Sequence, residues 1–232
     1  MSHILDISNL AIGYSKKAPL LQDINCRLVC GTVTGILGPN GIGKSTLLKT
    51  IAGLLPPLHG SVSFIGTRKV MDICAFVPSQ PVRATHFSVE DTVSTGRYRY
   101  TNWLGIEKRE GWQIILQALE STGISHLAGR NSADLSDGEF HRVAIARALV
   151  QDTPWILLDE PTAFLDIANK KATGALLRKL ASDKQKGILF STHDLSLAAE
   201  YCDRFWIMTP DGVFHQGTPD EMEKTGIIEQ LY

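Results

Sequence analysis

The sequence predicts an α/β fold built around a mainly parallel sheet, and two observations support this prediction. Short apolar segments of strand length alternate with helical segments along much of the chain, which is typical of a parallel sheet covered by helices. One of these apolar segments runs directly into a glycine-rich stretch that opens a helix. The length of 232 residues suits one such domain with a sizeable insertion, so we expect a single domain over residues 1–232.

Strand-like segments dominate the first part of the chain. Patterning indicates strands at 4–8, 24–29 and 61–65, and a short apolar run at 33–37 indicates a buried strand. A helix over 46–52 is expected to end at Gly53, before two prolines. Further apolar runs are candidates for buried strands of the parallel sheet: 73–77, 155–158, 188–190 and 204–208.

The segment from 81 to 151 has a different character. It shows little strand pattern, and apolar residues such as Trp112, Ile115, Leu116 and Leu119 recur at helical spacing. A strongly helical run over 140–150 closes the segment. We therefore expect 81–151 to form a mainly helical subdomain whose last helix returns the chain to the sheet.

Residues 38–46 read Gly-Pro-Asn-Gly-Ile-Gly-Lys-Ser-Thr and match the phosphate-binding pattern G-x-x-x-x-G-K-[ST] in full. The glycines can adopt positive φ and allow the backbone to approach phosphates closely, and successive N–H groups with the helix start form an anion nest. Lys44 is expected to reach the β- and γ-phosphates, and the Ser45 hydroxyl to bind Mg²⁺. The sequence predicts that a nucleoside triphosphate is bound by Gly38, Pro39, Asn40, Gly41, Ile42, Gly43, Lys44, Ser45 and Thr46.

The apolar run at 155–158 ends in two carboxylates, Asp159 and Glu160. Asp159 is placed to hold Mg²⁺ through water, which would complete the set begun by Ser45. Glu160 is placed to orient or deprotonate an attacking water. An acidic pair at a strand end is also compatible with a solvated turn, but the phosphate-binding loop favours a hydrolytic site.

Composition limits the partners that the chain can have. Lys and Arg number 23 against 24 Asp and Glu, so no strong positive field would hold nucleic acid. No stretch approaches the roughly 20 apolar residues that cross a bilayer, and the N-terminus lacks a signal-peptide pattern. We expect a cytoplasmic protein that reaches a membrane only through a partner. The cysteines are expected to be reduced and packed: Cys26, Cys30, Cys74 and Cys202.

Residues 135–139 read Leu-Ser-Asp-Gly-Glu and precede the helical run. Ser136 suits a helix N-cap, which is either a plain cap or an anion site with exposed N–H groups. Here the chain resembles the ATP-binding-cassette ATPases, whose signature is usually Leu-Ser-Gly-Gly-Gln. Asp137 and Glu139 replace neutral residues of that signature. Their charges are expected to weaken the attraction of the helix start for a γ-phosphate without abolishing it, because Ser136 and Gly138 remain.

The resemblance covers about 4–217 and implies a phosphate-loop core with an N-terminal antiparallel β subdomain and a helical insertion. It also implies roles for further residues. Gln80 would contact Mg²⁺ or the lytic water, and His193 would contact the γ-phosphate, although a single histidine after a strand is more often structural. Tyr14 would stack on adenine, unless it is only a packed surface residue.

The resemblance further implies that two copies pair head to tail. Each ATP would then lie between the phosphate loop of one copy and Ser136 and Gly138 of the other, with Asp166 at the seam between them. The segment 163–166 departs from the family pattern at Ala163 and Phe164. The implied cycle is closure on two ATP–Mg²⁺, hydrolysis by water that Glu160 activates, and opening when phosphate leaves.

Other nucleotide-binding classes fit the sequence less well. A GTPase would show Asn-Lys-x-Asp after a strand, whereas Asn169 and Lys170 are followed here by Lys-Ala. A small-molecule kinase would not need the Leu-Ser-x-Gly segment.

The segment 88–98, followed by Trp-Leu-Gly at 103–105, indicates what the ATPase drives. It mixes polar, aromatic and basic residues around Arg97 and could be only a solvated loop. It resembles the helical part of ATPases from importers of iron–siderophore complexes, haem and vitamin B12. The resemblance implies a multi-span permease as partner, indirectly a solute-binding protein, and a location at the cytoplasmic face of the inner membrane. Alternatives are a zinc or manganese importer, an exporter, or a soluble ATPase not tied to transport.

Overall fold

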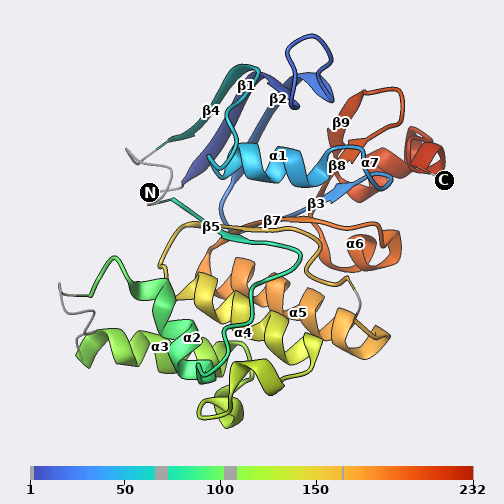
Figure 1. Cartoon of the computed structure of the whole chain (residues 1–232). Coiled ribbons are helices and arrows are strands. Elements are labelled where there is room, and N and C mark those ends of the chain that lie inside the picture. The colour runs from blue at the N-terminus through green and yellow to red at the C-terminus, as the bar shows by residue number, and fades with distance from the viewer. Residues whose placement is uncertain (1–2, 66–72, 102–108, 164, 232) are drawn as a thin grey trace.

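Two β-sheets and a group of helices make up the structure, a computed structural model that describes residues 3–65, 73–101, 109–163 and 165–231. The described strands form a three-stranded sheet of order β2-β1-β4 and a six-stranded sheet of order β5-β6-β7-β3-β8-β9. Figure 1 shows α1 between these sheets, with further helices on the opposite side of the larger sheet. Residues 103–105 and Phe164, which the sequence singled out, lie outside the described residues.

The smaller sheet is antiparallel, as the sequence resemblance implied. It consists of β1 (Ile4–Ile12), β2 (Leu21–Val29) and β4 (His59–Ile65). Buried and exposed residues alternate along much of β2, because one face of the sheet is covered and the other is open to solvent. The covered face shares a hydrophobic core with α1 (Lys44–Ile51) and with one face of the larger sheet.

The larger sheet is mainly parallel, which confirms the predicted fold class. Its parallel strands are β3 (Val33–Leu37), β5 (Cys74–Val77), β6 (Trp155–Leu158), β7 (Gly187–Ser191) and β8 (Arg204–Met208). The added edge strand β9 (Phe214–Gly217) is antiparallel to β8 and was not predicted. Its four residues are only partly apolar and therefore carry no clear strand pattern.

Helices cover the second face of the larger sheet. These are α5 (Ile167–Lys184), α6 (Leu195–Tyr201) and part of α4 (Asp137–Leu149), which share a core with the strands. The short α7 (Pro219–Lys224) follows β9. In the described part of the chain, no helix is both long and apolar enough to span a bilayer.

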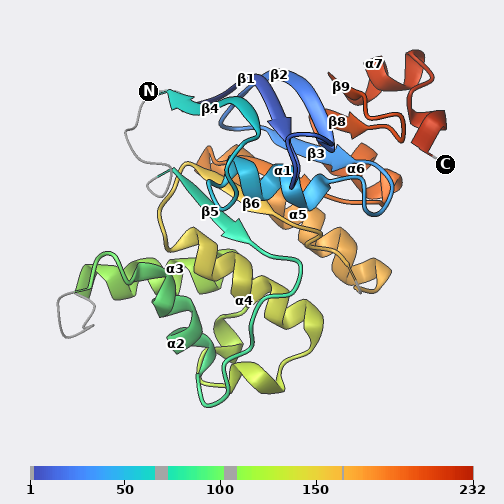
Figure 2. The same ribbon diagram turned by 45° about the horizontal axis from the view of Figure 1, so that its top comes forward.

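The described residues between 81 and 151 contain helices and no strand. They are α2 (Val89–Ser94), α3 (Arg109–Ser121) and α4, with short 3₁₀ turns at Thr95–Arg97, Ser125–Leu127 and Ser132–Asp134, and they enclose a core of their own. Figure 2 shows this group projecting from the sheet. Ile115 and Leu119 enter that core, whereas Trp112 and Leu116 are exposed on α3. These apolar residues lie on a helix, as their spacing predicted, but only two of the four are buried.

The sheet order brings three loops to one place. Strands β3, β7 and β6 are parallel neighbours, so their carboxyl ends lie at the same edge. The phosphate-binding loop follows β3, Asp159 and Glu160 follow β6, and His193 follows β7. Residues that are far apart in the sequence are thereby gathered around one site.

Candidate nucleotide-binding site

The loop between β3 and α1 adopts the open, glycine-dependent path that the sequence predicted. Gly38, Gly41 and Gly43 have φ of 153°, 80° and 114°. A Cβ at Gly38 would lie 2.6 Å from the carbonyl oxygen of Met208, so a side chain there would collide with β8. Helix α1 begins directly after Gly43 and has no acidic residue in its first turn. Its first N–H groups and positive dipole end are therefore well suited to an anion.

Lys44 places a cation at the centre of this loop. Its buried ammonium donates hydrogen bonds to the carbonyl oxygens of Gly38 at 2.8 Å and Pro39 at 3.0 Å, and lies 4.0 Å from Glu160 Oε1. Burial lowers the pKa of Lys44, while the nearby carboxylates of Glu160 and Asp159 oppose that shift. The arrangement holds the ammonium where phosphate oxygens could replace the backbone carbonyls.

Asp159 and Ser45 form the oxygen pair that a magnesium ion would need. The Ser45 hydroxyl donates to Asp159 Oδ1 at 2.8 Å, and the buried Ser191 hydroxyl donates to the same oxygen at 2.8 Å. A hydroxyl beside a carboxylate suits Mg²⁺, which commonly takes one or two carboxylates together with substrate phosphates. Across the described ranges, no group of three or more His, Cys, Asp or Glu is arranged to hold a metal ion. The residues present thus fit Mg²⁺ when phosphates complete its ligands.

Glu160 occupies a conformation that few non-glycine residues adopt. Its φ is 46°, and its backbone N–H donates to Ser191 Oγ at 2.8 Å. A left-handed residue costs about 1–3 kcal/mol, and such strain gathers at functional sites. Ser191 therefore contacts both acidic residues, a link that the sequence analysis missed. The only signal for it was a serine directly after the predicted strand 188–190.

A cavity of about 270 Å³ lies over the loop and is lined by Tyr14, Leu20, Gly41, Gly43, Lys44, Ser45, Thr46 and Glu160. Tyr14 is 77% exposed, and its hydroxyl lies 3.3 Å from Thr46 Oγ1. The phenol ring is thus tethered at one end while a large part of it remains accessible. The structure brings most of the predicted phosphate-binding residues, Glu160 and Tyr14 to one cavity.

The remaining predicted site residues do not line this cavity. Gln80 follows β5 and lines a separate cavity of about 230 Å³ together with Arg83, Asp137 and His141. His193 is exposed after β7, and Asp166 caps α5 by accepting the Asn169 N–H at 2.8 Å. Ser136 and Gly138 lie at the start of α4.

The start of α4 is organised by a capping box. Ser136 Oγ accepts the Glu139 N–H at 3.4 Å, and Glu139 Oε2 accepts from the Ser136 hydroxyl at 2.8 Å and from its N–H at 2.9 Å. These hydrogen bonds lower the pKa of Glu139. Asp137 forms an ion pair with Arg83 at 2.5 Å. The partners of these two carboxylates, Ser136 for Glu139 and Arg83 for Asp137, were not predicted from the sequence.

Asn169, another residue that the sequence analysis missed, connects the α5 cap with the start of α4. Its side-chain Nδ2 donates to Asp166 Oδ2 at 3.0 Å, and its Oδ1 accepts from Arg142 at 3.5 Å. A Cβ on Gly138 would come within 3.1 Å of the Asn169 side chain. Close packing against Asn169 thus explains a glycine at this position.

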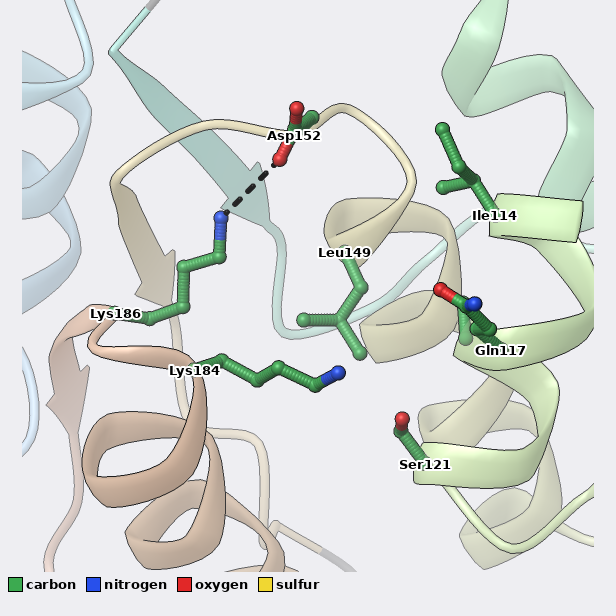
Figure 3. Close-up of a pocket in the computed structure, with 8 residues that line it drawn as sticks. Ile114, Gln117, Ser121, Leu149, Asp152, Lys184 and Lys186 are labelled. Carbon is green, nitrogen blue, oxygen red and sulfur yellow. Dashed lines mark ion pairs between the residues drawn. The ribbon is translucent and has the colours of Figure 1, made fainter. Parts of the chain in front are cut away.

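A further cavity, of about 210 Å³, lies between α3 and the end of α5 and holds none of the predicted site residues (Figure 3). Lys186 and Asp152, which pair across 3.6 Å at its rim, precede β7 and β6, so it is on the opposite edge of the sheet from the phosphate-binding loop. The cavity over the loop is therefore the candidate nucleotide-binding site.

Comparison with known proteins shows the family of this chain. The family description "ABC transporter" matches residues 21–163. The achromobactin transport ATP-binding protein CbrD of Dickeya dadantii is 37% identical over 96% of this chain and 85% of its own length. The hemin import ATP-binding protein HmuV of Hahella chejuensis is 39% identical over 92% and 86%. The solved structure of cbiO1 from Clostridium perfringens has a TM-score of 0.85 and 32% identity, covering 99% of this chain and 94% of that one.

These likenesses extend over nearly the whole chain. The chain belongs to the ABC transporter family and has the fold of its ATP-binding subunits. It is accordingly an ATP-binding protein and an ATPase of the class that is coupled to transport, as the sequence resemblance implied.

Proposed function

We propose that this chain is the ATP-hydrolysing subunit of a membrane importer for an iron–siderophore complex, haem or cobalamin. Relatives named for achromobactin transport and hemin import support this substrate class. The chain would work at the cytoplasmic face of the inner membrane, bound to a multi-span permease that receives its substrate from a solute-binding protein.

Each residue of the site has a proposed role in ATP binding or hydrolysis. The N–H groups of the loop and Lys44 bind the phosphates, and Tyr14 stacks on adenine. Ser45 and Asp159 would hold Mg²⁺, with Gln80 as a further contact, and the bound ion would offset the charge of the phosphates. Glu160 activates the attacking water as a general base, and His193 contacts the γ-phosphate.

The incomplete cavity is the observation that carries the proposed assembly. Within one chain, the described cavity contains the phosphate-binding loop but not Ser136, Gly138 or Asp166. A second copy, placed head to tail, would supply Ser136 and Gly138 to the exposed side of the ATP. ATP would then favour the closed pair, because ADP lacks the γ-phosphate that bridges the two copies.

Arg97 is buried within the helical segment and does not lie on its surface. It is 6% exposed, donates to the Val150 carbonyl at 3.3 Å, and stacks on Tyr100 at 4.1 Å. Arg97 therefore anchors the turn after α2 to the end of α4. The exposed Tyr98 beside it, at 61%, is a better candidate for contact with the permease.

Isolation of a tagged Glu160→Gln variant from membranes, in mild detergent with ATP and Mg²⁺, tests the proposal. We expect two copies of the chain with unhydrolysed ATP, together with a protein of many membrane-spanning helices. Turnover should fall about 10²- to 10⁴-fold. Glu120→Gln, at an exposed site on α3, is the matched control and should hydrolyse ATP normally. Normal turnover by Glu160→Gln would reject the base, and a purely cytosolic partner would reject transport.

A further inference from the structure

Arg83 joins the segment that carries Gln80 to the start of α4. Its Nη1 donates to the Leu135 carbonyl at 2.5 Å, and its Nη2 donates to Asp137 Oδ1 at 2.5 Å. The guanidinium also lies 4.6 Å from the centre of the Phe140 ring. One planar cation thus contacts a backbone carbonyl, a carboxylate and an aromatic ring. All three belong to residues 135–140, which comprise the Leu-Ser-Asp-Gly-Glu segment and the next residue of α4.

Asp137 places a negative charge at the start of α4. It is the first residue of α4 and directly follows Ser136, and its side chain is 68% exposed. A carboxylate at a helix start favours the helix itself but repels an anion that approaches the same N–H groups. The buried His141 also lies near Asp137 and Arg83, but burial lowers the pKa of its imidazole, so at neutral pH it supplies little positive charge.

We infer that Arg83 is a positioning residue that neutralises Asp137 and fixes the start of α4, so that this helix can accept the γ-phosphate of ATP bound to a second copy. The inference rests on the proposed head-to-tail assembly. Because Arg83 lies in the same segment as Gln80, it also links α4 of one copy to the loop that would contact Mg²⁺ in that copy.

A double-mutant cycle in the Glu160→Gln background tests this role, because dimerisation can then be measured at equilibrium without turnover. The readout is the ATP concentration that gives half-maximal dimer by analytical ultracentrifugation. Arg83→Ala should raise this concentration about two- to fivefold per site, as expected for loss of an exposed ion pair. Adding Asp137→Asn to Arg83→Ala should restore the value of Asp137→Asn alone to within about twofold.

Two further measurements separate charge compensation from a merely structural role. The defect of Arg83→Ala should shrink as salt rises to about 1 M, because salt screens the uncovered carboxylate. Arg83→Lys should recover part of the affinity, since it returns the charge but not the forked geometry. Thermal unfolding and nucleotide binding by the monomer identify any variant that has lost its fold.

The outcomes distinguish the inference from the proposed function. If Glu160→Gln does not dimerise with ATP, the head-to-tail assembly and the role of Arg83 both fail. If it dimerises and Arg83→Ala has no effect, Arg83 has no such role. If Arg83→Ala is impaired but Asp137→Asn gives no relief, Arg83 acts through packing and charge neutralisation is wrong.

Discussion

Ser191 shows how a single buried side chain can organise an active site. Its hydroxyl donates to Asp159 Oδ1 and accepts the backbone N–H of Glu160, each at 2.8 Å. The first contact orients the carboxylate proposed to hold Mg²⁺, and the second supports the left-handed backbone of Glu160. Groups that orient metal ligands commonly change activity when they are removed. Ser191 should therefore act on the chemical step without touching ATP.

Ser191→Ala should lower kcat about 10- to 100-fold and change the KM for ATP little, because the phosphate-binding loop and Lys44 remain intact. Steady-state ATPase kinetics with varied ATP and Mg²⁺ measure this split. Ser182→Ala, at an exposed position of α5, is the control and should match the parent. An equal kcat for Ser191→Ala and the parent would show that this hydrogen-bond pair is dispensable.

At the scale of the elements, the start of α4 is stabilised by the two acidic side chains that replace the usual signature residues. Glu139 closes the capping box with Ser136, and Arg83 covers Asp137. The acidic residues thus stabilise the helix start at which a γ-phosphate is proposed to bind. Because the Ser136 hydroxyl already donates to Glu139, binding of phosphate would have to compete with that hydrogen bond.

Glu139→Ala should destabilise the fold by roughly 0.5–1 kcal/mol through loss of the cap, whereas Glu139→Gln should lose less because an amide can still accept. Urea unfolding measures both changes, with Glu223→Ala on α7 as the control. Hydrogen bonds lower the pKa of folded Glu139 below 4.5. The advantage of Glu139 over Gln is therefore present above pH 4.5 and is lost as the pH falls through the folded-state pKa. A difference that does not depend on pH would contradict this origin.

The sequence patterns predicted most elements of the sheets, for a physical reason. Strands such as Val33–Leu37 and Trp155–Leu158 are buried on both faces and appear as continuous apolar runs with distinct ends. The edge strand Phe214–Gly217 has no such pattern, because only the last of its four residues is buried and the sequence does not alternate between apolar and polar residues.

At the scale of the whole molecule, fixed motifs could be predicted and long-range contacts could not. The phosphate-binding loop is contiguous, so its residues were assigned directly. Arg83 and Asp137 are 54 positions apart, and Ser191 and Asp159 are 32 apart, so their contacts depend on how the sheet and helices assemble. The same assembly leaves Ser136 and Gly138 outside the described nucleotide cavity. Under the proposed head-to-tail assembly, a second copy would bring Ser136 and Gly138 to this cavity.

The ATPase rate per subunit, measured across protein concentrations at saturating ATP and Mg²⁺, tests this composite site most directly. If each site needs two copies, the rate per subunit should rise with concentration at high dilution and reach a plateau once dimers dominate. The dissociation constant of the Glu160→Gln dimer, measured with ATP, should lie within the same range of protein concentration. A rate per subunit that stays constant over the whole range, with the protein monomeric throughout, would contradict the account.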